Sequence, residues 1–323
     1  MKKIVLCIIV ILFAIFFIST GYRKRTDVVL TDDSINEDNM IGSRYDNPIV
    51  PNGFKKIETE TASWELDETG NPKGWNKGLV VEDEIGNQFV WVPVKNEDFG
   101  NFKKEAEVLM DEESEEEQNQ IKRYGGFYIA RYEAGVSENM QDALENISED
   151  TNNVEGIPVS KSGIRAWNYI SLNKAKKNAI IMYDNEEIKS DLITTRQWLR
   201  TVNWIQESGY DFKDMRNLGN FADSFFIFIG LYSEDRGNTY KNGNPMGKVK
   251  NFILATGINE SAETNNIYDL FGNLMEFTDG YVEDRGYYSV GGYYSETASL
   301  KGAYLLGVEP LDKLGFRVVL YFK

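Results

Sequence analysis

Three acidic side chains surround a glycine-asparagine turn near the C-terminal end of the sequence. They are Asp269, Glu276 and Asp279, in the stretch NIYDLFGNLMEFTDG that spans residues 266–280. Carboxylates placed around a turn can act as general acids or bases, or can hold a hard cation through their oxygens. The same stretch, with its aromatic and apolar residues, could also be a corner of a core. Catalytic site, metal site and core corner are the three alternatives.

Composition excludes several kinds of chemistry. Histidine is absent, and Cys7 is the only cysteine. The folded part therefore has no histidine base, no internal disulfide and no Cys or His cluster for a metal. The chain carries 35 basic and 51 acidic residues, a net charge of −16, whereas nucleic-acid binding needs a basic surface. We therefore expect no nucleic-acid partner.

An apolar segment lies at the start of the sequence. Residues 4–22 are an uncharged run of 19 residues with basic residues on both sides. As a helix, this run would match the hydrocarbon thickness of a bilayer, so residues 1–25 are predicted to be a membrane anchor or signal segment. No clear small-residue cleavage site is present, which favours the anchor; cleavage would give a secreted protein.

The charge after the apolar segment suggests where the rest of the chain lies. All 51 acidic and 30 of the basic residues follow residue 25, giving a net charge of −21. Anionic lipid head groups would repel so acidic a domain. We therefore expect a bacterial membrane protein with a single N-terminal segment and an extracytoplasmic domain.

Composition also divides the remainder of the chain. Residues 26–52 are polar, acidic and rich in turn residues, which predicts a tether. A globular domain is expected over 53–323, since hydrophobic residues make up 41% of the chain and suffice for a sizeable core. Within this domain, the acidic block 105–120 is interpreted as a solvated insertion rather than a cation site.

Strand and helix signals alternate along the domain. Helices are predicted from an N-cap at Ser171 to Met182, and from a cap at Thr194 or Thr195 to a stop at Gly209. Strands are predicted at 87–94, 126–135 and 315–322. From residue 210 the chain is rich in Gly, Asn, Asp and Tyr, which is typical of short strands with long loops. These signals predict an α+β fold with two main helices and short mixed or antiparallel strands.

Six segments resemble, in order, the successive signatures of the formylglycine-generating enzyme family, also called sulfatase-modifying factor. They are FYIARYEAG (127–135), WNYISLNKAKKNA (167–179), LITTRQWLRTVNWI (192–205), NIYDLFGNLMEFTDG (266–280), SVGGYYS (289–295) and LGFRVVL (314–320). The resemblance covers about residues 45–323 and includes bacterial surface and prophage-associated members. It implies the large, loop-rich variant of the C-type lectin fold.

The resemblance also bears on catalysis. Family members that oxidise a sulfatase cysteine bind copper through paired cysteines near the C-terminal end, and related members bind iron through histidines. The matching region, 290–317, has no cysteine, and the chain has no histidine. No copper or iron is therefore expected, which favours a protein that is not an enzyme. An atypical non-haem oxidoreductase of the family and a structural cell-envelope component are the alternatives.

Family members bind calcium through a segment similar to 266–280. Carried over by position, the ligands would be the side chains of Asp269 and Glu276 and the carbonyls of Gly272 and Leu274. Calcium takes six to eight hard oxygens, several of which such a turn supplies. In the alternative, Glu276 is buried and satisfied by backbone amides or by an arginine such as Arg317, without metal. Either way we expect a structural site.

A tyrosine-rich segment, 284–299, is the candidate ligand-binding surface. Tyrosine, serine and glycine are typical of adaptable recognition surfaces, and the ligand could be an extracellular protein or a glycan. The residues expected to contact it are Tyr287, Tyr288, Tyr293 and Tyr294. In the alternative, a hairpin turns half of these rings into the core. The polar loop 233–248 is predicted to line the same face. The sequence thus favours a membrane-anchored, non-enzymatic ligand-binding module.

Overall fold

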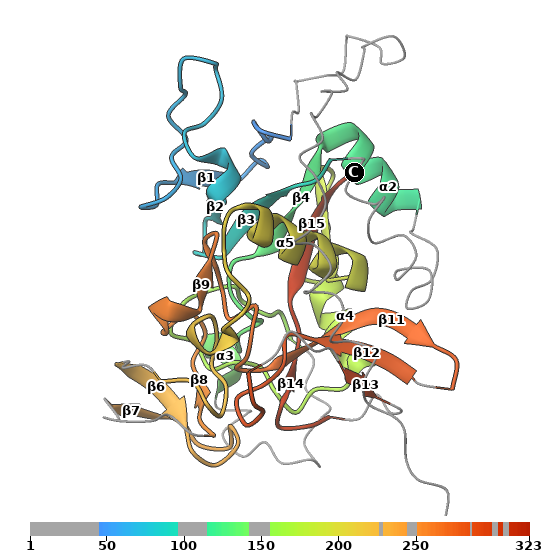
Figure 1. The fold of residues 1–323 in the computed structure, drawn as a ribbon. Coiled ribbons are helices and arrows are strands. Elements are labelled where there is room, and N and C mark those ends of the chain that lie inside the picture. Colours follow the sequence, from blue (N-terminus) through green and yellow to red (C-terminus); the bar gives the residue numbers. More distant parts are fainter. Residues whose placement is uncertain are drawn as a thin grey trace, which may run out of the picture. The chain divides into compact units, whose positions relative to one another are not determined.

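The computed structural model in Figure 1 describes most of the predicted domain. The described residues are 45–95, 115–141, 156–225, 229–243, 251–284, 286–298, 303–305 and 310–323. The predicted anchor or signal segment, 1–25, lies outside them. Among the described residues, no helix is long and apolar enough to cross a membrane.

The folded unit begins earlier than predicted. It spans Ser43–Lys323, so the last residues assigned to the tether, 45–52, belong to it. The indole of Trp91 donates to the carbonyl of Tyr45 over 2.7 Å, and the Tyr128 hydroxyl donates to that of Ile49 over 2.8 Å. These two buried aromatics need acceptors for their polar atoms, and the polar segment supplies them.

An antiparallel six-stranded sheet forms the centre of the unit. Its spatial order is β1 (Phe54–Ile57), β2 (Val80–Asp83), β3 (Gln88–Pro93), β4 (Gly126–Ala130), β15 (Val318–Phe322) and β5 (Ile188–Leu192). Figure 1 shows the C-terminal strand β15 beside β4, where Val319 pairs with Ile129. The three strands predicted from sequence are β3, β4 and β15, although β4 ends at Ala130.

Two helices cover opposite faces of this sheet. Along β3, Phe89 and Trp91 belong to one apolar cluster and Val90 and Val92 to another, as alternation requires. Helix α4 (Leu172–Ile180) packs in the first cluster and α5 (Thr195–Glu207) in the second. Both helices were predicted, and α5 begins with a capping box at Thr194.

The rest of the unit consists of short strands joined by long loops. One group of them forms a four-stranded mixed sheet of β13 (Ala303–Leu305), β12 (Gly286–Val290), β11 (Met275–Val282) and β14 (Leu314–Gly315). Another forms a three-stranded sheet of β7 (Lys241–Gly243), β6 (Gly230–Ser233) and β8 (Ile253–Leu254). A third is the pair of β10 (Ile267–Tyr268) and β9 (Glu263–Thr264). The short helix α3 (Glu138–Gln141) lies outside these sheets. The protein therefore has the α+β fold that the sequence predicts.

A further helix corrects the interpretation of the acidic block. Helix α2 (Glu115–Tyr124) includes the end of the segment predicted as a solvated insertion, 105–120. The side chains of Glu117 and Arg200 are 3% and 4% exposed, and their Oε1 and Nη1 atoms lie 2.5 Å apart. The side chain of Gln120 donates through Nε2 to the Gly126 carbonyl, and its Oε1 accepts from the backbone amide of Phe322. Buried partners, rather than composition, decide the position of this helix.

Replacing Glu117 with alanine should destabilise the domain by roughly 3–5 kcal/mol, because a buried guanidinium would lose its carboxylate. Urea unfolding measures this loss. The matched control is Glu116→Ala, since Glu116 pairs with Lys189 at the surface and its side chain is 48% exposed. This control should cost less than about 1 kcal/mol. Equal losses in the two variants would contradict the anchoring role of Glu117.

Candidate functional site

The stretch 266–280 contains β10, the first residues of β11 and, between them, a tight turn at residues 269–274. Asp269, Gly272 and Asn273 all have left-handed backbone, with φ of 53°, 76° and 54°. A Cβ atom at Gly272 would lie 2.5 Å from the Asn220 carbonyl oxygen, so no side chain fits there. The amide of Gly272 donates to the carbonyl of Gly291 over 2.8 Å. The turn is therefore held by two segments distant in sequence.

The two predicted acidic ligands of this turn are fully buried, and each has one oxygen without a partner. Arg317 donates through Nε to Oε1 of Glu276 over 2.7 Å, while Oε2 has no hydrogen-bond partner. The amide of Gly257 donates to Oδ2 of Asp269 over 2.7 Å, while Oδ1 has none. The predicted pair between Glu276 and Arg317 is thus present, but the second carboxylate oxygen of Glu276 has no hydrogen-bond partner.

Sequence reasoning missed a third buried carboxylate, Glu133. Its Oε1 accepts from the amide of Leu274 over 2.9 Å, and its Oε2 accepts from the side chain of Asn273 over 2.7 Å. Glu133 lies in FYIARYEAG, one of the segments that carry the family resemblance. A glutamate within a largely apolar segment was the signal that could have found it.

The three buried carboxylates are near only one positive charge among the described residues that act on all of them, the guanidinium of Arg317. Burial raises the pKa of Glu133 well above its usual value, and Asp269 and Glu276 raise it further. Burial also raises the pKa of Asp269 to about 6 and that of Glu276, with Arg317 opposing both shifts. Three ionised carboxylates near one guanidinium would leave two uncompensated negative charges. Either protons or a cation would relieve this imbalance.

The turn fits a calcium ion in part. Two orphaned hard oxygens, Asp269 Oδ1 and Glu276 Oε2, are what calcium prefers. Among the residues that the structure describes, no three His, Cys, Asp or Glu side chains are arranged to hold a metal ion. A bound cation would therefore also need backbone oxygens, as the predicted carbonyls of Gly272 and Leu274 would provide. Asp279 lies apart from this group, at the surface, where it accepts from the Thr195 amide.

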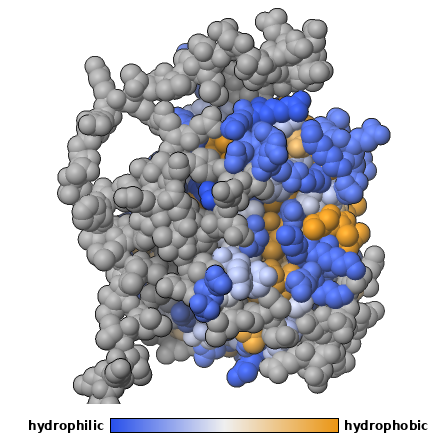
Figure 2. Space-filling view, turned by 90° about the vertical axis from the view of Figure 1, so that its right-hand side faces the viewer, coloured by the Kyte–Doolittle hydropathy of each residue, from blue (hydrophilic) through white to orange (hydrophobic). Residues whose placement is uncertain are grey.

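The four predicted tyrosines differ in how far the structure buries them. Tyr288 and Tyr294 are 8% and 3% exposed and pack in apolar clusters. Tyr287 is half-buried and pairs across the β11–β12 hairpin with Tyr281, their ring centroids 5.0 Å apart. Tyr281, which sequence reasoning missed, is 46% exposed. Figure 2 views the side of the hairpin tip, where the coloured surface is mainly hydrophilic with small hydrophobic patches.

Tyr293 lies in a different setting from Tyr287. It is half-buried, and the ammonium of Lys313 lies 4.6 Å from its ring centroid. Next to it, the Tyr294 hydroxyl donates to Oδ2 of Asp312 over 2.8 Å. The Tyr294 amide donates to the Asn273 carbonyl over 3.0 Å, which ties this segment to the buried turn.

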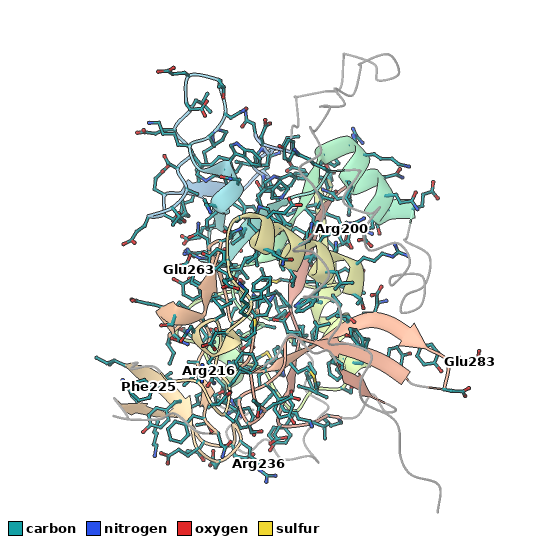
Figure 3. All side chains as sticks on the ribbon, in the orientation of Figure 1. Arg200, Arg216, Phe225, Arg236, Glu263 and Glu283 are labelled. Carbon is teal, nitrogen blue, oxygen red and sulfur yellow. The ribbon has the colours of Figure 1, made fainter. Side chains whose placement is uncertain are left out.

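The described part of the polar loop, 233–243, lies against the same segment. Arg236 Nε is 3.7 Å from the Asp312 oxygen that Tyr294 also uses. The side chain of Asn168 donates to the carbonyls of both Arg236 and Asp312. Figure 3 shows Arg236 at the lower end of the view, pointing away from the ribbon. The loop and the tyrosine segment therefore form one surface, which we call the Tyr293 surface: Arg236, Tyr293, Asp312 and Lys313.

Comparisons with known proteins found weak structural similarity and no sequence match. No family model matches the chain, and no curated protein does. PvdO from Pseudomonas aeruginosa is similar with a TM-score of 0.40 and 13% identity, over 75% of this chain and 97% of that one. The crystal structure of CarF gives 0.34 and 15%, over 61% and 87%. Treponema denticola variable protein 1 gives 0.34 and 13%, over 72% and 95%. TM-scores below 0.5 establish neither a family nor a function.

The raised pKa of Asp269 predicts how stability depends on pH in calcium-free buffer. An unfolded aspartate titrates near pH ~4, whereas folded Asp269 has a pKa of about 6. The folded protein thus binds more protons, so this contribution to stability is complete below pH ~4 and is lost as pH rises through 6. Urea unfolding of the wild type and Asp269→Asn between pH 4 and 7 measures it.

The quantity to compare is the difference between these two proteins. Exposed acids with lowered pKa values, such as Glu65 and Asp184, make stability rise with pH, and they do so equally in the wild type and in the variant. The wild type should lose stability relative to Asp269→Asn as pH rises. A wild type that gains stability relative to the variant over this range would contradict the assignment.

Proposed function

We propose that this protein is a non-enzymatic ligand-binding module displayed outside the cytoplasmic membrane of a bacterium. Residues 4–22 would anchor it, and the scaffold would be the formylglycine-generating-enzyme-like variant of the C-type lectin fold. The observation that carries the proposal is the Tyr293 surface. A buried polar turn supports it from within, half-buried Tyr293 lies there beside the ammonium of Lys313, and the Asp312 carboxylate accepts from the neighbouring Tyr294.

The placement of the acidic residues supports binding over catalysis. Glu133, Asp269 and Glu276 are at most 1% exposed, and their hydrogen bonds go to backbone amides, Asn273 and Arg317. A general acid or base must come within hydrogen-bond reach of its substrate. Buried groups in this setting act on the stability of the fold instead.

Calcium would complete the support of this surface. The ion would be held by Asp269 and Glu276 together with the carbonyls of Gly272 and Leu274, and its two positive charges would offset the excess of buried carboxylate charge. Stabilising the turn would also stabilise the segment attached to it, since Asn273 accepts from the Tyr294 amide. The role of the metal would be structural: it would stabilise the turn and take no part in catalysis.

Added calcium should raise the melting temperature of the metal-free protein. Stabilisation is roughly 2.7 kcal/mol when free calcium is about a hundredfold above its dissociation constant. Differential scanning calorimetry measures the shift, which Glu276→Gln should abolish. Asp279→Asn, in the same stretch but at the surface, is the matched control and should keep the full response. An unchanged melting temperature for the wild type would remove calcium from the proposal.

Cells that express the full chain allow display and binding to be tested together. Protease added to intact cells should digest the domain. The cells should also bind probes on a glycan array or an array of extracellular proteins. Tyr293→Ala should weaken that binding about tenfold or more, as loss of an aromatic anchor does. Protection from protease would contradict the location.

The hairpin tyrosine provides the control for this binding test. Tyr281→Ala removes an exposed ring of similar size from a different part of the domain, so it should leave binding unchanged. If Tyr281→Ala abolishes binding while Tyr293→Ala does not, the ligand contacts the β11–β12 hairpin instead. Melting temperatures of both variants separate loss of contact from loss of folding.

A further inference from the structure

Arg236 has an unusual backbone conformation within a tightly bonded loop. Its φ is +63°, a left-handed value that side-chain-bearing residues seldom adopt. The Ser233 hydroxyl accepts from the Gly237 amide, and an Asp235 carboxylate oxygen accepts from the Thr239 amide. Such strained conformations persist where surrounding bonds enforce them, and they cluster at functional sites.

Buried side chains fix the same loop from the protein interior. Asn168 donates to the Arg236 carbonyl over 2.9 Å, and Arg165 donates to the Gly237 carbonyl over 2.6 Å. Both donors belong to residues that are at most 8% exposed. The core therefore holds the backbone of Arg236 in place while its side chain points outward (Figure 3).

The guanidinium is largely open to a ligand. The Arg236 side chain is 74% exposed, and its contact with Asp312 is long, at 3.7 Å. The Asp312 oxygen concerned already accepts from the Tyr294 hydroxyl over 2.8 Å. Arginine presents a planar set of donors that can bind a carboxylate through two parallel hydrogen bonds. Most of those donors remain available to solvent.

We infer that the Tyr293 surface recognises a carboxylate group on its ligand and that Arg236 is the residue that pairs with it. The inference rests on the proposed binding function and names the chemistry of the ligand. Lys313, over the ring of Tyr293, adds a second positive charge to the surface, against the one negative charge of Asp312. The chain as a whole has a net charge of −16, so a singly charged carboxylate would be repelled less than a doubly charged phosphate.

Two sources could supply this carboxylate, namely an acidic sugar and the free C-terminus of a peptide. The test uses the purified full-length chain and paired probes. One pair is an array of glycans ending in uronic or sialic acid beside their neutral parents. The other is a library of short random peptides made with a free or an amidated C-terminus. Preference for the charged member of either pair supports the inference and identifies the source.

Substitutions test the role of Arg236. Arg236→Gln should weaken binding of the charged probe about tenfold or more and leave the weaker binding of its neutral partner unchanged. Arg236→Lys should recover part of the affinity, because lysine keeps the charge but not the paired donors. Arg216→Gln is the matched control, since Arg216 is an exposed arginine paired with Asp214 elsewhere on the surface. It should bind like the wild type.

The outcomes separate this inference from the proposed function. Equal binding of charged and neutral probes, with loss in Tyr293→Ala and none in Arg236→Gln, would overturn the carboxylate inference and leave the binding function standing. Equal losses in Arg236→Gln and Arg216→Gln would also overturn it, because general electrostatics would then explain the effect. Absence of binding in both probe sets would overturn the inference together with the function on which it rests.

Discussion

The ion pair between Arg317 and Glu276 is the interaction on which the rest of the domain depends. The guanidinium of Arg317 also donates to the carbonyls of Ala130 and Tyr268, over 3.0 and 2.9 Å. It thus joins the end of β4, the end of β10 and the start of β11 to the C-terminal segment that leads into β15. Because the side chains of Arg317 and Glu276 are both fully buried, removing one charge would leave the other without compensation.

This polar centre also supports the outer surface. Asn273 and Leu274, which follow the glycine of the turn, bond to Glu133, while the carbonyl of Asn273 accepts from the amide of Tyr294. The excess of buried carboxylate charge and the position of the tyrosine segment are therefore properties of one connected network. Such networks favour a single arrangement when every member is satisfied and are sensitive to any member that is not. The orphaned oxygens of Asp269 and Glu276 are the part of this network that a cation or protons would complete.

The parts of the fold that were predicted are those with local signals. Helix α5 carries its cap at Thr194, its apolar period and its glycine stop within one short segment. Strand β3 alternates between two clusters, and its pattern is visible without any partner. Helix α2 was missed because its acidic composition is typical of a solvated segment. The residue that buries its Glu117 is Arg200, which lies 83 positions away, and no local pattern reports a partner at that distance.

The sequence by itself determined which chemistries are absent and which elements form. Without histidine, and with Cys7 as its only cysteine, the chain lacks the usual soft and imidazole ligands, and its local patterns were enough to predict an α+β fold. Only the tertiary structure decided which acids share a buried site and which tyrosines reach the surface. Tyr293 and Tyr294 are neighbours of the same type, yet one is half-buried beside Lys313 and the other is buried against Asp312. Exposure and charge balance depend on groups that folding brings from distant parts of the chain, and this is why residue types and spacing alone could not predict them.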